Sequence, residues 1–74
     1  MKLNTIAKDM TEIIFSDNSK LFYSYNTPVV FISAENKAYK TNKRYSSTTT
    51  RHISKYLEGK MAELKEQNFF NSIK

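Results

Sequence analysis

A stretch of basic and hydroxyl side chains between residues 37 and 60 holds most of the chemistry that this sequence can offer. It contains seven cations and one carboxylate, so its net charge is 7 − 1 = +6, against +5 for the whole chain of 74 residues. The rest of the chain has five cations and six carboxylates, which gives 5 − 6 = −1. A basic surface raises the local concentration of anions and steers them toward it. The stretch therefore predicts an anionic partner.

The hydroxyl run from Ser46 to Thr50 and the cations that follow it suit a phosphate group. One of residues 46–48 should cap a helix, whose first turn leaves backbone N–H groups free at the positive end of the helix dipole. Arg51 and Lys55 are one turn apart and repel each other unless an anion lies between them. Hydroxyl runs also cap helices without any ligand, so that alternative stays open. The predicted anion or nucleic-acid site consists of Lys40, Lys43, Arg44, Tyr45, Ser47, Thr48, Thr49, Arg51, His52 and Lys55.

Three tyrosines, Tyr39, Tyr45 and Tyr56, are interleaved with these basic residues. Exposed rings beside positive charge can stack on unpaired bases, each stack being worth about 1–3 kcal/mol. Tyr56 lies on the apolar stripe of the expected helix and is more typical of a core residue. Tyr45 is the better surface candidate, although a ring that closes the edge of a sheet would show the same pattern.

Catalytic and metal sites are not expected. His52 is the only histidine and the chain has no cysteine, so a zinc site would need carboxylates as its remaining ligands. A general base needs an activated partner and a substrate pocket, and neither is suggested here. A single glycine excludes a glycine-rich phosphate loop. We predict no catalytic residue, no metal and no cofactor, and therefore a protein that is not an enzyme.

The elements expected to position the basic residues form an α+β fold. Alternating side chains between turn signals predict a short three-stranded antiparallel sheet over about 20–25, 28–33 and 38–41. A C-terminal helix over about 48–66 should pack on this sheet through its apolar stripe. Gly59 disfavours helix by about 1 kcal/mol relative to alanine, so a bend or an end is expected there.

The segment over about 4–15 is compatible with two structures. Its apolar residues recur at the spacing of one helical face, which favours an N-terminal helix: Leu3, Ile6, Ala7, Met10, Ile13 and Ile14. The β-branched and aromatic run from Thr11 to Phe15 instead favours an extra strand. We prefer the helix and keep the strand as the alternative.

Size and composition limit the organisation of the chain. A protein of 74 residues has room for one small domain, 1–74, which buries only about 60% of the surface of its unfolded chain. No apolar run is long enough to span a membrane, and the first residues lack the apolar centre of a signal peptide. We expect a cytoplasmic protein, located in the host cytoplasm if a phage encodes it.

Two motifs resemble a known family. Residues 23–29 read Tyr-Ser-Tyr-Asn-Thr-Pro-Val, and residues 43–52 read Lys-Arg-Tyr-Ser-Ser-Thr-Thr-Thr-Arg-His. They are similar to the patterns Tyr-Ser-Tyr-x-Thr-x-Val and Lys-x-Tyr-Ser-x-Thr-Thr-x-Arg-His of a small domain of unknown function encoded by many tailed bacteriophages and plasmids. The match covers about residues 22–57. The resemblance implies a hairpin-plus-helix module without a known catalytic site, and it assigns no functional residues.

These observations lead to two hypotheses about function. The first is a non-enzymatic accessory protein of a phage or mobile element that binds nucleic acid or a host nucleoprotein complex, for example as an inhibitor of a CRISPR effector. The second is a protein–protein interaction module or small homodimer, formed through the C-terminal apolar segment that contains Phe69, Phe70 and Ile73, with no nucleic-acid contact. A membrane partner is not expected. Affinity that falls steeply with salt favours the first hypothesis.

Overall fold

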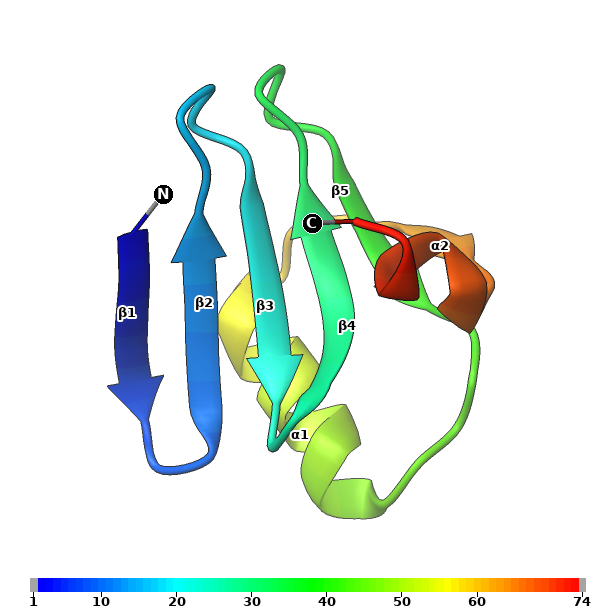
Figure 1. The fold of residues 1–74 in the computed structure, drawn as a ribbon. Coiled ribbons are helices and arrows are strands. Elements are labelled where there is room, and N and C mark those ends of the chain that lie inside the picture. The colour runs from blue at the N-terminus through cyan, green and yellow to red at the C-terminus, as the bar shows by residue number, and fades with distance from the viewer. Residues whose placement is uncertain (1, 74) are drawn as a thin grey trace.

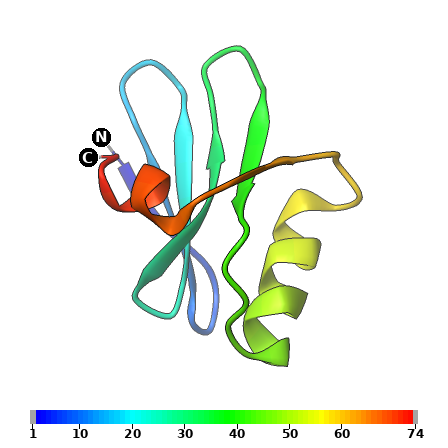
Figure 2. The same cartoon turned by 90° about the vertical axis from the view of Figure 1, so that its right-hand side faces the viewer.

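Within residues 2–73, six strands form one sheet in the order of the chain, and a short helix lies on each face of the sheet (Figure 1). The computed structural model describes residues 2–73. The elements are β1 (Lys2–Ala7), β2 (Met10–Ile14), β3 (Lys20–Ser24), β4 (Thr27–Ile32), β5 (Ala38–Thr41), α1 (Ser47–Leu57), β6 (Glu63–Lys65) and α2 (Gln67–Asn71). In the view turned by 90°, α1 and α2 lie on opposite sides of the strands (Figure 2). Neither helix has the length and apolar character needed to cross a membrane.

Strands β1 to β5 form an antiparallel meander with short turns. Two-residue turns join β1 to β2 and β3 to β4. The turns contain residues in the left-handed region, among them Asp9 with φ 63, Asn18 with φ 72 and Asn36 with φ 69. Asp and Asn tolerate this conformation because their short side chains bond nearby backbone. Tyr25 also has a positive φ of 57, which is uncommon for a bulky residue.

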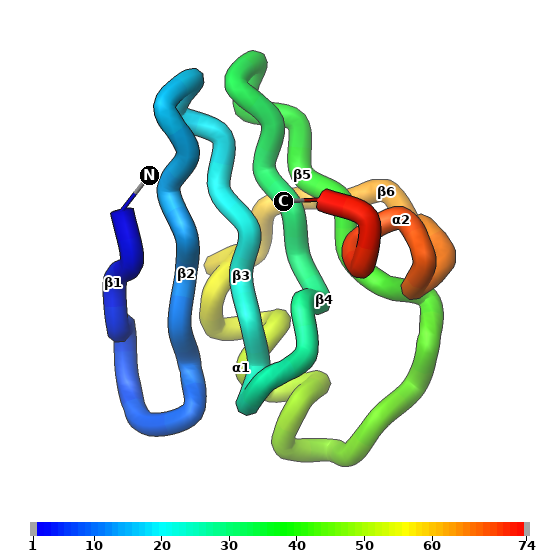
Figure 3. Tube along the Cα trace, in the orientation of Figure 1, coloured from blue at the N-terminus to red at the C-terminus, as the bar shows by residue number. Residues whose placement is uncertain are grey.

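Strand β6 makes the sheet mixed. It pairs parallel to β5, with Tyr39 opposite Glu63 and Thr41 opposite Lys65. A parallel neighbour requires a connection that returns the chain to the end where β5 began, and α1 provides that crossover. The Cα trace then continues from β6 into α2 on the other side of the sheet (Figure 3).

Buried side chains lie on both faces of the sheet. On the α1 side, the ring of Phe22 stacks on Tyr56 with centroids 4.1 Å apart. On the α2 side, Leu21 and Phe70 are buried, and the Phe69 ring meets Phe31 edge-on at 6.1 Å. One cluster of buried apolar residues contains Met10, Phe22, Val29, Val30, Ala38 and Leu57. The sheet is therefore the middle layer of a three-layer arrangement.

The predicted fold, a three-stranded antiparallel sheet packed by a C-terminal helix, is wrong. The expected strands over 20–25, 28–33 and 38–41 correspond in position to β3, β4 and β5, but these are the middle of a six-stranded mixed sheet. The expected helix over 48–66 ends at Leu57, because Glu58 adopts a left-handed φ of 51 and Gly59 a φ of 82. The residues after it form β6 and α2 instead.

The preferred N-terminal helix over about 4–15 is also wrong. The alternative, a strand over residues 11–15, overlaps β2, and the rest of the segment belongs to β1 and to the β1–β2 turn. The apolar spacing was misleading because its members do not share one buried face: Met10 is buried, whereas Leu3 is 69% and Ile6 is 42% exposed. The turn at Asp9 then allows Ile13 and Ile14 to pair with β1 and β3.

Candidate anion-binding surface

Helix α1 begins with a side-chain cap and without acidic residues. Ser46 is extended, with φ −91 and ψ 166, and its Oγ accepts a hydrogen bond from the backbone N–H of Thr49 at 3.2 Å. The cap satisfies one of the N–H groups that a first helical turn leaves free. No acidic side chain in the first turn offsets the positive end of the helix dipole. This helix start therefore remains electrostatically favourable for an anion.

Two residues of the predicted site, Thr49 and His52, face the sheet and fasten α1 to β3. Ser24, only 2% exposed, donates from its Oγ to Thr49 Oγ1 at 3.3 Å and shares a hydrogen bond of 2.8 Å with His52 Nδ1. The His52 ring also lies 5.6 Å from the ring of Tyr25. Ser24 and Thr49 also line a cleft of about 480 Å3 between the β3–β4 turn and the start of α1. The geometry is that of a structural polar anchor.

Tyr45 is also held within the fold. Its hydroxyl donates to Gln67 Oε1 at 2.8 Å, and its ring packs against the buried cluster. Lys43 Nζ lies 5.4 Å from the ring centroid, a cation–π arrangement. Of the other two tyrosines considered for base stacking, Tyr56 packs on Phe22, and Tyr39 lies 5.5 Å from the ring of Phe69. All three rings thus have partners inside the protein.

The structure divides the basic stretch between two ends of the molecule. Lys40 is half-buried in β5 and lines a cleft of about 390 Å3 together with Leu57. Lys60 donates from Nζ to Asn36 Oδ1 at 3.2 Å, which places it beside the β4–β5 turn and next to Lys37. This turn lies at the opposite end of the sheet from the first residues of α1 (Figure 1). The sequence analysis treated these cations as one group because no local pattern shows that α1 carries the chain back along the length of the sheet.

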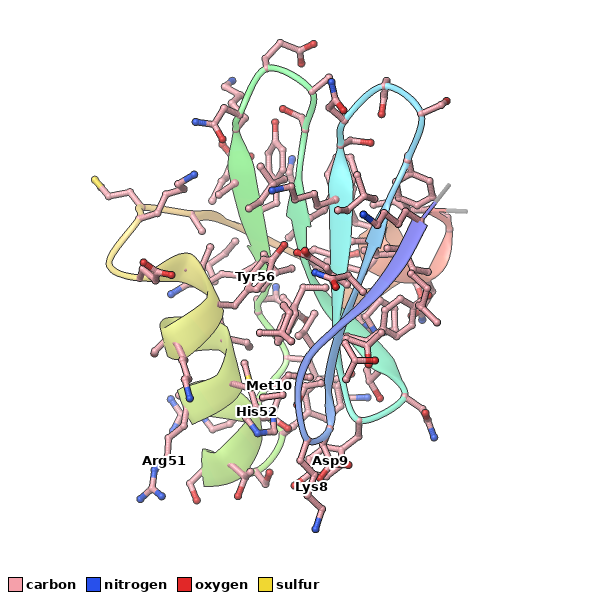
Figure 4. The ribbon with its side chains drawn as sticks, turned by 90° about the vertical axis from the view of Figure 1, so that its left-hand side faces the viewer. Lys8, Asp9, Met10, Arg51, His52 and Tyr56 are labelled. Atoms are coloured by element: carbon pink, nitrogen blue, oxygen red, sulfur yellow. The ribbon has the colours of Figure 1, made fainter. Side chains whose placement is uncertain are left out.

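Six residues of the predicted site remain exposed along α1 and in the loop before it, and we call them the α1 surface: Lys43, Arg44, Ser47, Thr48, Arg51 and Lys55. Among residues 2–73 the only ion pair joins Lys65 Nζ to Glu63 Oε2, at 3.0 Å, so no cation of this surface is in direct contact with a carboxylate. Arg51 extends into solvent, away from the sheet (Figure 4). Four cations and two hydroxyls are thus free to contact a ligand.

Lys8 is a cation that the sequence analysis did not assign to the site. It lies in the β1–β2 turn and reaches solvent at the same end of the molecule as Arg51, while His52 lies between that turn and α1 (Figure 4). Asp9 in the same turn partly offsets its charge. Because the segment around Lys8 was predicted as a helix outside the basic stretch, no sequence signal connected it with α1.

The model of a family of unknown function, DUF8033, matches residues 1–72. The chain belongs to this family. No curated protein and no solved structure matches the chain. This match confirms that the chain resembles a domain of unknown function. Membership in DUF8033 extends over both flanks of the two motifs, because the matched range covers nearly the whole chain.

The fold of this DUF8033 member also holds a buried carboxylate that the sequence analysis did not single out. Glu12 is 8% exposed and accepts hydrogen bonds from the Tyr56 hydroxyl at 2.7 Å and from Asn4 Nδ2 at 3.1 Å. Burial, and then the hydrogen bond and charge of Glu12, raise the pKa of Tyr56. Glu12 lines an open cleft of about 850 Å3 beside α1, whose rim includes Lys20 and Lys55. The bonds to Asn4 and Tyr56 satisfy the carboxylate, which joins β1, β2 and α1.

Proposed function

We propose that this DUF8033 protein is a non-enzymatic binding protein whose α1 surface contacts the phosphates of a nucleic acid, alone or within a host nucleoprotein complex. The observation that carries the proposal is the group of four exposed cations, Lys43, Arg44, Arg51 and Lys55, without a carboxylate partner among residues 2–73. Lys43, Arg44 and Arg51 lie near a helix start that contains no acidic residue, and Lys55 lies in the last turn of the same helix. Phosphate is the ligand that complements this combination.

The arrangement supports contact with the backbone rather than with the bases. The three tyrosines considered for base stacking, Tyr39, Tyr45 and Tyr56, are half-buried and contact other side chains of the protein, whereas lysine and arginine side chains of the α1 surface are exposed. Backbone contacts provide affinity and little sequence preference. We therefore propose binding that depends strongly on salt and weakly on sequence.

The biological setting that we propose follows the resemblance to phage and plasmid proteins. In that setting the protein acts in the host cytoplasm on a nucleic-acid machine, and inhibition of a defence complex such as a CRISPR effector is one concrete version. A basic inhibitor cannot work by imitating the charge of DNA. It would bind a complex that already carries RNA or DNA.

A matched pair of charge reversals tests the α1 surface. Arg51→Glu with Lys55→Glu changes the net charge from +5 to 5 − 4 = +1, and Lys37→Glu with Lys60→Glu produces the same change at the far end of the sheet. We expect at least about a tenfold loss of affinity for a labelled RNA or DNA oligonucleotide in the first variant, and a much smaller loss in the second. Fluorescence anisotropy measures both.

The salt dependence of the same binding separates phosphate contact from apolar contact. Between about 50 and 200 mM salt, affinity should fall steeply, and the slope should decrease by about two units in the Arg51/Lys55 variant, since each lost phosphate contact removes about 0.9. Retained binding in that variant contradicts the proposed surface. Salt-independent capture of a partner from nuclease-treated lysate would favour the alternative, a protein–protein interaction module.

A further inference from the structure

We propose that two copies of the chain pair through β1, antiparallel and about a two-fold axis, and so join their sheets into one sheet of twelve strands. The partner is a second copy of this chain. The interaction surface is the outer edge of β1, on the side away from β2. The proposal goes beyond the nucleic-acid function and does not depend on it.

Strand β1 is an open edge without the usual protection. Within residues 2–73 it borders only β2, so no strand of this part of the chain pairs with the backbone groups along its outer side. Natural edge strands are kept from pairing by proline, by charged residues or by being very short. β1 has six residues with no proline and a single charge, on Lys2. Leu3 is 69% and Ile6 42% exposed, which leaves apolar surface on this edge.

The strand at the opposite edge of the sheet, β6, has features that protect an edge from pairing with another chain. β6 has only three residues, two of which, Glu63 and Lys65, form an ion pair. Its short length and its two charges are both features that keep an edge strand from pairing with another strand. The two edges therefore differ, and β1 is the one that offers a template to another strand.

The distribution of charge favours a second copy as the partner. Within residues 2–14 two cations face two carboxylates, so the net charge of the β1–β2 hairpin is 2 − 2 = 0, although the chain carries +5. Two basic chains repel least when they approach through their neutral parts. A strand that pairs antiparallel with its own copy also meets the requirement of a two-fold interface, in which one patch serves both partners.

The alternation of side chains limits the register of the pair. Residues opposite each other in a sheet point to the same face, so the axis must pass through a residue rather than between two residues. The β1 ladder is regular up to Thr5, where the register shifts. The regular part of β1, residues 2–5, is centred between Leu3 and Asn4. The axis therefore passes through one of these two residues, which then lies opposite the same residue of the second copy.

Pairing of this kind has a consequence for the α1 surface. A two-fold axis that relates antiparallel neighbours is perpendicular to the sheet, so both α1 helices lie on the same face of the twelve-stranded sheet. The dimer then presents two α1 surfaces in the same direction. A long anion could engage both of them, with the gain in avidity that two linked sites provide.

Single cysteines test the contact directly, because the natural chain has none. Opposite residues of an antiparallel pair have Cα atoms about 4.5–5.5 Å apart, a separation that a disulfide can bridge. We expect Leu3→Cys or Asn4→Cys to form disulfide-linked dimers at least about ten times faster than Leu64→Cys, which is 58% exposed on the opposite edge. Non-reducing gels and intact mass measure the product. Equal rates at all three positions would overturn the proposal.

Sedimentation equilibrium provides the second test and requires no nucleic acid. A strand-edge interface is small, so we expect weak association, visible as an increase in mass as the protein reaches about 1 mM. Leu3→Lys with Thr5→Lys should weaken it at least about tenfold, whereas the same change at Leu64 should leave it unchanged. A wild-type protein that stays monomeric at that concentration contradicts the dimer. If the lysine variant does not fold by circular dichroism, the cysteine rates decide the question.

Discussion

The Glu12–Tyr56 pair shows how one buried carboxylate joins distant parts of the chain. The two residues are 44 positions apart, and their hydrogen bond of 2.7 Å connects β2 to α1. Periodicity correctly predicted that Tyr56 faces the interior, where its ring stacks on Phe22. It could not predict the partner of the hydroxyl, because a glutamate in a half-polar segment is normally a surface residue.

Tyr56→Phe should lower the free energy of unfolding at pH 7 by about 1.5–3 kcal/mol, because a buried carboxylate loses a donor. Urea denaturation measures the loss. Tyr23→Phe is a suitable control, since the Tyr23 hydroxyl has no hydrogen-bond partner among residues 2–73 and should change stability little. The pKa of Tyr56 is raised in the folded state, so the advantage of wild type over Tyr56→Phe is full below the unfolded-state tyrosine pKa of about 10 and shrinks above it. A difference that grows above pH 10 would contradict this assignment.

At the scale of helices and strands, Gln67 also connects parts of the chain that are far apart in sequence. It is the first residue of α2, and its Oε1 accepts hydrogen bonds from Thr41 at 2.9 Å and from Tyr45 at 2.8 Å. Its Nε2 donates to the Pro28 carbonyl oxygen at 2.7 Å. One side chain thus fixes α2 to β4, to β5 and to the loop before α1. Its partners are 22 to 39 residues away in sequence, so no local pattern could have indicated it.

Gln67→Leu keeps a side chain of similar size but removes all of these hydrogen bonds. We expect the free energy of unfolding to fall by about 2 kcal/mol or more, since two donors and one carbonyl lose a partner worth about 1 kcal/mol each. Chemical denaturation of the variant measures the effect. Asn68→Leu, at the exposed neighbouring position, is the control and should change stability by less than about 0.5 kcal/mol.

Strands and turns in the middle of the chain were predictable because each carries a local signal. Turn residues such as Asn36 and the alternation around Tyr23 locate β3 to β5 without knowledge of the rest of the fold. The first hairpin was missed because its apolar spacing also matches a helical face. The exposure of Arg51 and Lys55 is a local property of the helix, whereas the burial of Thr49 and the contact of His52 depend on Ser24 of another element.

At the scale of the whole molecule, the C-terminal segment closes the second face of the sheet. Phe70 is 0% exposed, so this ring cannot contribute to the self-association that the sequence suggested for Phe69, Phe70 and Ile73. It packs on the face that also carries Leu21, on the side away from α1. Burial of Phe70 therefore assigns this ring to the interior of the fold.

Phe70→Ala should lower the free energy of unfolding by about 3–5 kcal/mol, the usual loss for a fully buried phenylalanine. For a small domain this is a large part of the total stability. Thermal or urea denaturation measures it, and Leu64→Ala, a truncation at an exposed site, should have little effect. A Phe70→Ala protein with unchanged stability and weaker self-association would instead support a dimer through the C-terminal segment.

The order of elements along the chain also determines when this sheet becomes covered during synthesis. The meander can form early, because its neighbouring strands are joined by short turns and its contacts are local in sequence. Its two faces, however, are covered only by α1 and α2, which follow all five of its strands. A chain that has formed the meander and α1 therefore still has one uncovered sheet face until α2 packs on it. Slow translation of the last segment would prolong the time in which chaperones, or a second nascent copy, can bind that surface.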